Sequence, residues 1–125
     1  MSNPKPNGYI LIGSLLILCV SLGVYIYTLC PTVYWEDSAE FSAALGTLGL
    51  PHSPSFPLYV LTGHLFSKLP IGNVAFRTNL FSAFLASVSL VLLYYLTLII
   101  LSRVRAKEKH QLKLNITSSN HAQNY

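Results

Sequence analysis

Two long apolar runs, both free of charged residues, constrain this chain more than any other feature of its sequence. They cover residues 9–29 and 80–101. A helix of about 20 apolar residues is long enough to cross the hydrocarbon core of a bilayer. The composition agrees, because 52% of the residues are hydrophobic and only 10% are charged, which is unusual for a soluble domain. The sequence therefore predicts an all-α membrane protein with two transmembrane helices.

The two runs divide the chain into segments of different character. Residues 1–8 form a short polar leader, which we expect to be disordered. Residues 9–101 form a membrane module, in which the two spans are joined by the loop 30–79. Residues 102–125 form a tail that is first basic and then polar. If the chain carries out chemistry, we expect it in the loop.

Basic residues are distributed unevenly around the second span. The loop contains Lys68 and Arg77. Five more follow the span, namely Arg103, Arg105, Lys107, Lys109 and Lys113. Segments rich in Lys and Arg stay on the cytoplasmic side, so we expect both termini in the cytoplasm and the loop facing the periplasm, cell exterior or lumen. Despite the net charge of +4, this cluster predicts contact with membrane lipid and not with nucleic acid.

The loop is expected to contain two short helices. Residues 37–48 show apolar side chains at helical spacing, followed by Gly49 as a stop signal. The apolar positions are Phe41, Ala44, Leu45 and Leu48. Residues 58–69 form a second apolar segment, too short to span, which we expect to lie flat on the membrane.

Two further signals organise the loop. Three prolines fall within residues 51–57, which predicts a stiff, extended spacer between the two short helices. After the turn at residues 71–73, Asn73 is the predicted N-cap of the helix that enters the second span.

Three of the four carboxylates lie close together just after the first span, at Glu36, Asp37 and Glu40. On a helix Asp37 and Glu40 share a face, so one could act as a base while the other binds or positions a partner. The spacing also matches a capping box, in which Asp37 accepts a hydrogen bond from the backbone N–H of Glu40. Spacing alone favours capping, although a carboxylate fixed by capping is also preorganised for chemistry.

Other polar residues of the loop support weaker hypotheses. His52 and His64 could join the carboxylates in a metal site, but no ligand pair has the spacing of a tight metal site, so no metal or cofactor is expected. Arg77 lies where the chain re-enters the membrane. It could bind a phosphate group, or it could anchor the end of the helix at the interface, as interfacial arginines more commonly do.

The order of three motifs resembles that of a known family. The motifs are WEDSAEF at 35–41, HSPSFPL at 52–58 and RTNL at 77–80. Over about residues 9–101 the chain is similar to the N-terminal part of a family of polytopic membrane proteins that includes the transmembrane protein O-mannosyltransferases. These belong to the GT-C-type glycosyltransferases, which use lipid-phosphate sugars. The family pattern is close to DSGEF followed by HPPG(F/Y)PL, so Ala39 and Ser55 replace glycines and Ser53 replaces a proline.

The resemblance implies roles for four residues of the loop. Asp37 matches the catalytic acid of the first outward loop and would take the proton of an acceptor hydroxyl. Glu40 is grouped with it as a catalytic candidate, and His52 and Arg77 are candidates for substrate binding. The donor implied is a polyprenyl-phosphate sugar.

The size of the module limits what it can do alone. Two spans and a short loop cannot enclose a site shielded from water, since ligand sites form where several elements converge. We therefore expect the N-terminal catalytic-loop module of a glycosyltransferase, a fragment or split subunit that needs missing transmembrane helices or a partner subunit and is inactive by itself. The alternative is a non-enzymatic two-span protein whose loop docks another membrane protein.

Overall fold

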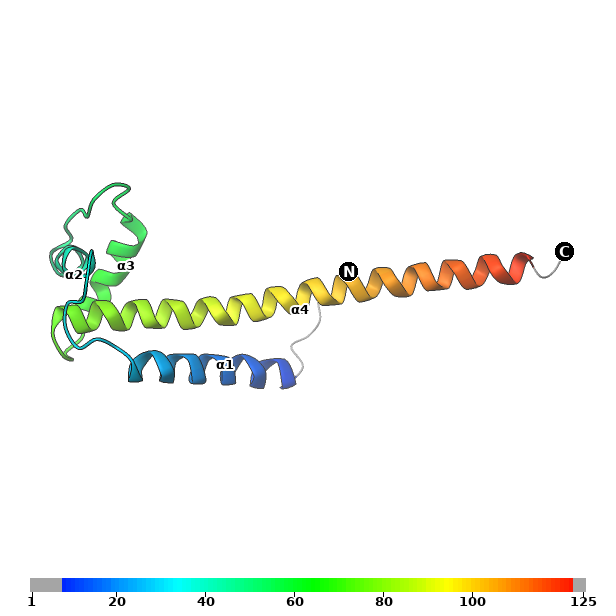
Figure 1. The fold of residues 1–125 in the computed structure, drawn as a ribbon, viewed down its shortest axis with the longest axis horizontal. Helices are drawn as coiled ribbons and strands as arrows, with labels where there is room; N and C mark the ends of the chain where they lie inside the picture. Colours follow the sequence, from blue (N-terminus) through cyan, green and yellow to red (C-terminus); the bar gives the residue numbers. More distant parts are fainter. Residues whose placement is uncertain (1–7, 123–125) are drawn as a thin grey trace. The chain divides into compact units, whose positions relative to one another are not determined.

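The computed structural model describes residues 8–122, and in these residues it contains four helices and no strand (Figure 1). In chain order the helices are α1 (Gly8–Tyr27), α2 (Ser38–Thr47), α3 (Pro57–Ser67) and α4 (Val74–Ala122). The predicted all-α fold is confirmed. The leader predicted over residues 1–8 lies outside the described residues except for Gly8. The chain divides into two compact units, residues 1–90 and 91–125, and each is described by itself.

Two of the helices are long and apolar enough to cross a membrane, namely α1 and the part of α4 from Val74 to Ile116. Each contains a window with a mean hydropathy of 2.4, and only 6% of each window is buried. Extensive uncovered apolar surface on a helix suits lipid or further apolar helices. The two predicted spans are therefore confirmed as apolar helices of sufficient length.

Helix α4 begins where the sequence predicted. The backbone N–H of Phe76 donates to Oδ1 of Asn73 at 2.8 Å, which confirms Asn73 as the N-cap. The helix continues well past residue 101, the predicted end of the span, because the following segment contains no proline or glycine and is rich in helix-favouring residues. Within the unit 91–125 the basic residues are therefore carried on a helix, which the sequence analysis did not predict.

The core of the unit 1–90 lies between α2 and α3, and Phe81 of α4 reaches it through its ring. Leu45 is completely buried there, and Val60 and Phe81 are no more than 5% exposed. Gly63 permits this close packing, since a Cβ atom at this position would lie 2.5 Å from Cδ2 of Leu45 and 2.9 Å from Cε1 of Phe81. Burial of these side chains provides the main driving force that holds α3 against α2.

The apolar face predicted for the first short helix is correct at its centre and wrong at its end. Ala44 and Leu45 are buried, whereas Leu48 is 50% exposed. Leu48, and not Gly49, is the left-handed residue that ends α2, with φ of 57°. The N–H of Gly49 then donates to the carbonyl of Ala44 at 3.0 Å, and this bond helps to offset the left-handed conformation of a leucine.

The second short helix is confirmed as α3, and its position on the membrane surface stays a prediction. It begins at Pro57, where a proline leaves no N–H unpaired. His64 faces α2, and its Nδ1 donates to the carbonyl oxygen of Leu45 at 2.6 Å. This histidine therefore ties α3 to α2 and does not join the carboxylates.

We predict that Gly63→Ala destabilises the loop by about 1–3 kcal/mol, because the added methyl group overlaps Leu45 and Phe81 and the helices must separate. Gly23→Ala in α1 is the matched control, since no atom lies within 4 Å of a Cβ there. Thermal unfolding followed by circular dichroism in detergent micelles measures both. Equal stability of the two variants would show that α2 and α3 are not packed as described.

Candidate active site

Glu40 and His52 are joined by two hydrogen bonds. The backbone N–H of His52 donates to Oε1 of Glu40 at 2.5 Å, and Nδ1 of the same residue donates to Oε2 at 3.0 Å. One carboxylate thus holds both the backbone and the ring of a residue 12 positions away. The contact attaches the proline-rich segment to the first turn of α2.

The proline-rich segment is folded back and not extended, so the predicted spacer is wrong. The N–H of Ser55 donates to the carbonyl of His52 at 2.8 Å, which closes a turn. Ser55 and Phe56 then adopt φ of 66° and 42°. The prolines restrict only their own φ and the residues before them, so the pairing of His52 with Glu40 and the turn decide the path.

The two positions where the chain lacks the glycines of the resembled pattern behave differently. Ser55 has a positive φ, so this position does require the left-handed conformation that glycine adopts most easily. Ala39 lies in the first turn of α2, where a glycine would only weaken the helix. Ser55 therefore adopts the left-handed backbone conformation that suits a glycine, at some cost in conformational free energy.

Asp37 occupies the N-cap position of α2, but the predicted capping box is wrong. Its carboxylate accepts no capping hydrogen bond from the described backbone, and Glu40 bonds to His52 and does not reach back to it. Glu36, directly before it, adopts a positive φ of 59°. Asp37 is exposed. Its carboxylate is therefore not used for capping, although it is held on a defined turn.

The contact between Glu40 and His52 changes the acidity of both groups. The hydrogen bond from the His52 side chain, followed by that from its backbone N–H, lowers the pKa of Glu40 below its usual 4.5. The hydrogen bond to Glu40 raises the pKa of His52 above its usual 6.5, and the charge of Asp37 adds a smaller effect in the same direction. Both side chains are exposed, so solvent screens the pair.

Asp37, Glu40 and His52 come together at the start of α2, as three of the four predicted site residues. One ligand atom from each lies within 4.8 Å of the other two, so the three could share a cation. The direct hydrogen bonding of Glu40 to His52 accounts for the closeness of two of them. His64 belongs to the core contact described above.

Arg77, the fourth predicted residue, has a structural position. Its guanidinium donates to three backbone carbonyls: Nε to Ile71 at 2.7 Å, Nη2 to Gly72 at 2.9 Å, and Nη1 to Ser67. Positive charge near the last carbonyls of α3 is favourable for the helix dipole. The guanidinium therefore fixes the turn between α3 and α4.

Two asparagines of the α4 start hold the segment that leaves the first span. Asn73 donates through Nδ2 to the carbonyl of Pro31 at 3.1 Å. Asn79 donates through Nδ2 to the carbonyls of Cys30 at 2.9 Å and Thr32 at 3.1 Å. The chain that leads to Asp37 is thus anchored at residues 30–32 to the start of α4.

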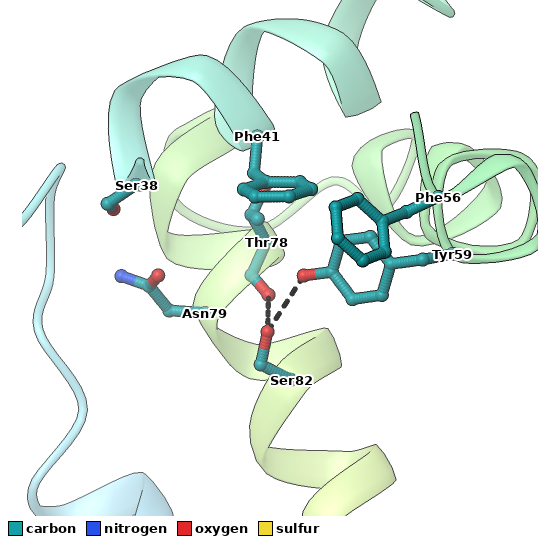
Figure 2. Close-up of a pocket in the computed structure, with 7 residues that line it drawn as sticks. All are labelled: Ser38, Phe41, Phe56, Tyr59, Thr78, Asn79 and Ser82. Atoms are coloured by element: carbon teal, nitrogen blue, oxygen red, sulfur yellow. Dashed lines mark hydrogen bonds between the residues drawn. The ribbon is translucent and has the colours of Figure 1, made fainter. Parts of the chain in front are cut away.

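Beside the carboxylates lies a cavity of about 280 Å³, which we call the aromatic pocket (Figure 2). Three aromatic rings form one side of it, and hydroxyl and amide groups form the other. Its lining residues are Ser38, Phe41, Phe56, Tyr59, Thr78, Asn79 and Ser82. The pocket was not predicted from the sequence. Five of its lining residues lie in the three motifs and Tyr59 directly follows the second, so only Ser82 lies apart from them.

The structure is that of an all-helical module with two helices that could cross a membrane, and the segment between them carries a carboxylate and histidine cluster beside a small pocket. The family model of the protein O-mannosyl-transferase TMEM260 N-terminal domain matches residues 37–123. The chain belongs to this family, which is the resemblance inferred from the sequence.

Two relatives are much longer than this chain, which matches only a small part of each. Protein O-mannosyl-transferase TMEM260 of Mus musculus is 35% identical over 84 residues, which cover 66% of this chain and 12% of the mouse protein. Protein O-mannosyl-transferase tmem260 of Dictyostelium discoideum is 26% identical over 87 residues, covering 66% of this chain and 11% of that protein. No solved structure matches the chain. The chain therefore spans about an eighth of the length of these relatives.

We predict that Glu40→Gln lowers the pKa of His52 toward its usual value of 6.5, because the charged acceptor of its hydrogen bond is lost. Asp37→Asn, the matched control, should lower it less, since Asp37 acts only through space. NMR titration of the imidazole resonances in lipid nanodiscs measures the effect.

The sign also fixes where the contact is strongest. The raised pKa of His52 gives stability that is complete below pH 6.5 and is lost as pH rises through the raised pKa. The lowered pKa of Glu40 gives stability that is complete above pH 4.5 and is lost as pH falls through the lowered pKa. The contact that holds the proline-rich segment against α2 should therefore be most stable between pH 4.5 and pH 6.5. An unchanged His52 titration in Glu40→Gln would contradict the contact.

Proposed function

We propose that this chain supplies the catalytic loop of a membrane glycosyltransferase that moves a sugar from a polyprenyl phosphate to an acceptor hydroxyl. The observation that carries the proposal is the carboxylate of Asp37, which makes no capping hydrogen bond and lies close to Glu40 and His52 at the start of α2. The family membership supports the proposal, and we propose mannose as the sugar because the relatives are named as O-mannosyl-transferases. The donor and the acceptor class come from the resemblance in sequence.

In the proposed reaction Asp37 takes the proton of the acceptor hydroxyl as the oxygen attacks the anomeric carbon. The bond between that carbon and the phosphate oxygen breaks, and polyprenyl phosphate leaves with inversion at the sugar. Glu40 and His52 hold the proline-rich segment in place beside the base. Positioning of this kind accounts for a large part of enzymatic rate enhancement.

The departing phosphate needs positive charge, and we propose that it comes from outside this chain. The guanidinium of Arg77 donates to three carbonyls of the turn, so in the proposed site it holds the turn and does not bind the phosphate. Longer relatives have room for further transmembrane helices that could provide the missing groups. The isolated chain is expected to have no transferase activity, because two spans cannot exclude water from the reaction.

For the topology we propose that both termini are cytoplasmic and that the loop faces the other side of the membrane. In a variant without Cys19 and Cys30, an impermeant maleimide is applied to sealed cells or vesicles whose non-cytoplasmic side faces outward. It should label Ser53→Cys directly and should label Asn115→Cys only after permeabilisation. The excess of basic residues after residue 101 is the reason. Labelling at position 115 from outside, or a glycan on Asn115, would reverse the orientation and remove the loop from the proposed side.

The role of Asp37 is tested in a full-length transferase that carries this segment, such as a fusion to the remainder of the mouse relative. We predict that Asp37→Asn and Asp37→Ala both lower sugar transfer by about 10²–10⁴-fold, because each removes the proton acceptor. Neither should reduce expression, since the Asp37 side chain makes no capping bond that its loss would break.

Glu36→Gln is the matched control, because it removes the neighbouring carboxylate, which lies outside the group formed by Asp37, Glu40 and His52. It should keep transfer near the parental rate. Near-parental transfer by Asp37→Asn would refute the role of Asp37 as the base.

A further inference from the structure

The aromatic pocket has the lining of a site for an uncharged polar ring. None of its seven lining residues, all in the described part of the chain, carries a charge (Figure 2). Its volume of about 280 Å³ lies just below the usual range for ligand sites, about 300–1,000 Å³. The pocket therefore suits one small ring and not a whole lipid-linked donor, and it does not suit a phosphate.

The aromatic side of the pocket is built from rings that support one another. The centroid of Phe41 lies 5.5 Å from that of Phe56 and 5.5 Å from that of Tyr59, with the second pair edge to face. Such contacts fix the ring positions. A rigid aromatic surface offers apolar contact to the C–H face of a sugar at little entropic cost.

The polar side of the pocket has hydrogen-bonding capacity that the protein leaves unused. Both N–H groups of the Asn79 amide are committed to the carbonyls of Cys30 and Thr32, so its oxygen remains an acceptor. Oη of Tyr59 lies 2.8 Å from Oγ of Ser82, and Oγ donates to the carbonyl of Thr78 at 3.2 Å. The Tyr59 hydroxyl therefore donates to Ser82 and keeps its lone pairs for a ligand. These groups suit sugar hydroxyls, which both donate and accept.

An almost wholly apolar groove of about 720 Å³ adjoins the pocket, and Phe56 and Tyr59 line both. We call it the apolar groove. Helix α3 contributes Leu58 and Leu65 to it, and the first turns of α4 contribute Phe81, Phe84 and Leu85. The α4 residues are the beginning of the apolar span, so the groove adjoins the part of α4 that is apolar enough to meet lipid. It can thus be entered by an apolar chain from the bilayer.

We propose that the aromatic pocket binds the sugar ring of the lipid-linked donor and that the apolar groove binds the first prenyl units of its chain, with Phe56 and Tyr59 between the two subsites. This inference rests on the proposed function and assigns a place to its donor. The shared wall is the argument for one occupant, because the donor carries its sugar and its prenyl chain on the two sides of one phosphate. That phosphate would lie between the two cavities, where the positive charge that we propose from outside this chain would meet it. A transmembrane helix covering the groove is the alternative occupant.

The test is direct binding to the 125-residue chain in nanodiscs, with two probes that differ only in the sugar. One is a short-chain prenyl phosphate bearing mannose, and the other is the same prenyl phosphate without it. Ser82→Ala and Tyr59→Phe should each weaken binding of the mannosyl probe by about 3- to 10-fold, the effect of one lost hydrogen bond, and should leave the sugar-free probe unchanged. Leu65→Ala should weaken both probes.

Matched controls separate subsite effects from general ones. Ser89→Ala removes another α4 hydroxyl that bonds the carbonyl four residues before it, as Ser82 does, but it lines neither cavity. Leu61→Ala removes another exposed leucine of α3, 60% exposed against 71% for Leu65, that also lines neither. Both controls should bind like the parent chain.

Three results would overturn the proposal: equal effects of Ser82→Ala on the two probes, equal effects of Leu61→Ala and Leu65→Ala, or no binding of the mannosyl probe. The last two would favour a helix as the occupant of the groove. Because the assay measures binding and not transfer, it gives the same answer whether or not Asp37 is the base. An inactive Asp37→Asn enzyme with an unaltered pocket would support the proposed function alone.

Discussion

The contact of Leu45 with Gly63 and Phe81 determines whether the loop has a site at all. It brings together three helices, each of which carries a different part of that site. Helix α2 carries the carboxylates and Phe41, α3 carries Tyr59, and α4 carries the polar side of the aromatic pocket. Only a residue without a Cβ atom allows Leu45 to lie as close to α3 as it does. The chemistry proposed for the surface therefore depends on the packing of one buried leucine.

Features encoded by short stretches could be predicted from the sequence, and contacts between distant polar groups could not. The length of the uncharged apolar runs predicted the two long helices, and the spacing of apolar residues predicted α2. A local side-chain signal predicted the Asn73 cap. Glu40 had two possible partners, the N-cap backbone three residues away and His52 in the next segment. The spacing of Asp37 and Glu40 favours the N-cap backbone, but His52 offers two hydrogen-bond donors to the one carboxylate. The sequence does not reveal such a competition, and the extended spacer was wrongly predicted for the same reason.

The residue composition of the site was predicted better than its geometry. Asp37, Glu40 and His52 were all named from the sequence and do come together, because the motif order places them on facing segments. The carbonyl contacts of Arg77 could not be predicted, since its three partners come together only when the turn after α3 closes. The pocket drew on residues from 38 to 82, so no local pattern could have indicated it.

Three of the four non-glycine residues with positive φ in the described part of the chain lie in the two segments that carry the proposed site, and Leu48 at the end of α2 is the fourth. Glu36, Ser55 and Phe56 all have positive φ without being glycine, at a cost of about 1–2 kcal/mol each. Such conformations persist only where the surroundings hold them. Here the Glu40 contact holds His52, and the rings of Phe41 and Phe56 lie 5.5 Å apart. Strain of this kind is expected in a loop whose conformation positions the side chains of the proposed site and does not maximise stability.

The distribution of charge gives a reason why this loop would form one side of a larger site. In an inverting displacement the nucleophile approaches the carbon from the face opposite the leaving group, so the base and the phosphate ligands must lie on opposite sides of the sugar. The loop places carboxylates at the start of α2 and an uncharged pocket beside them, and its Arg77 is occupied by the turn. Cations placed next to the carboxylates would pair with them and would draw the phosphate to the same side. A module that provides the base and the sugar surface, and leaves the cations to helices across the site, satisfies the geometry that inversion requires.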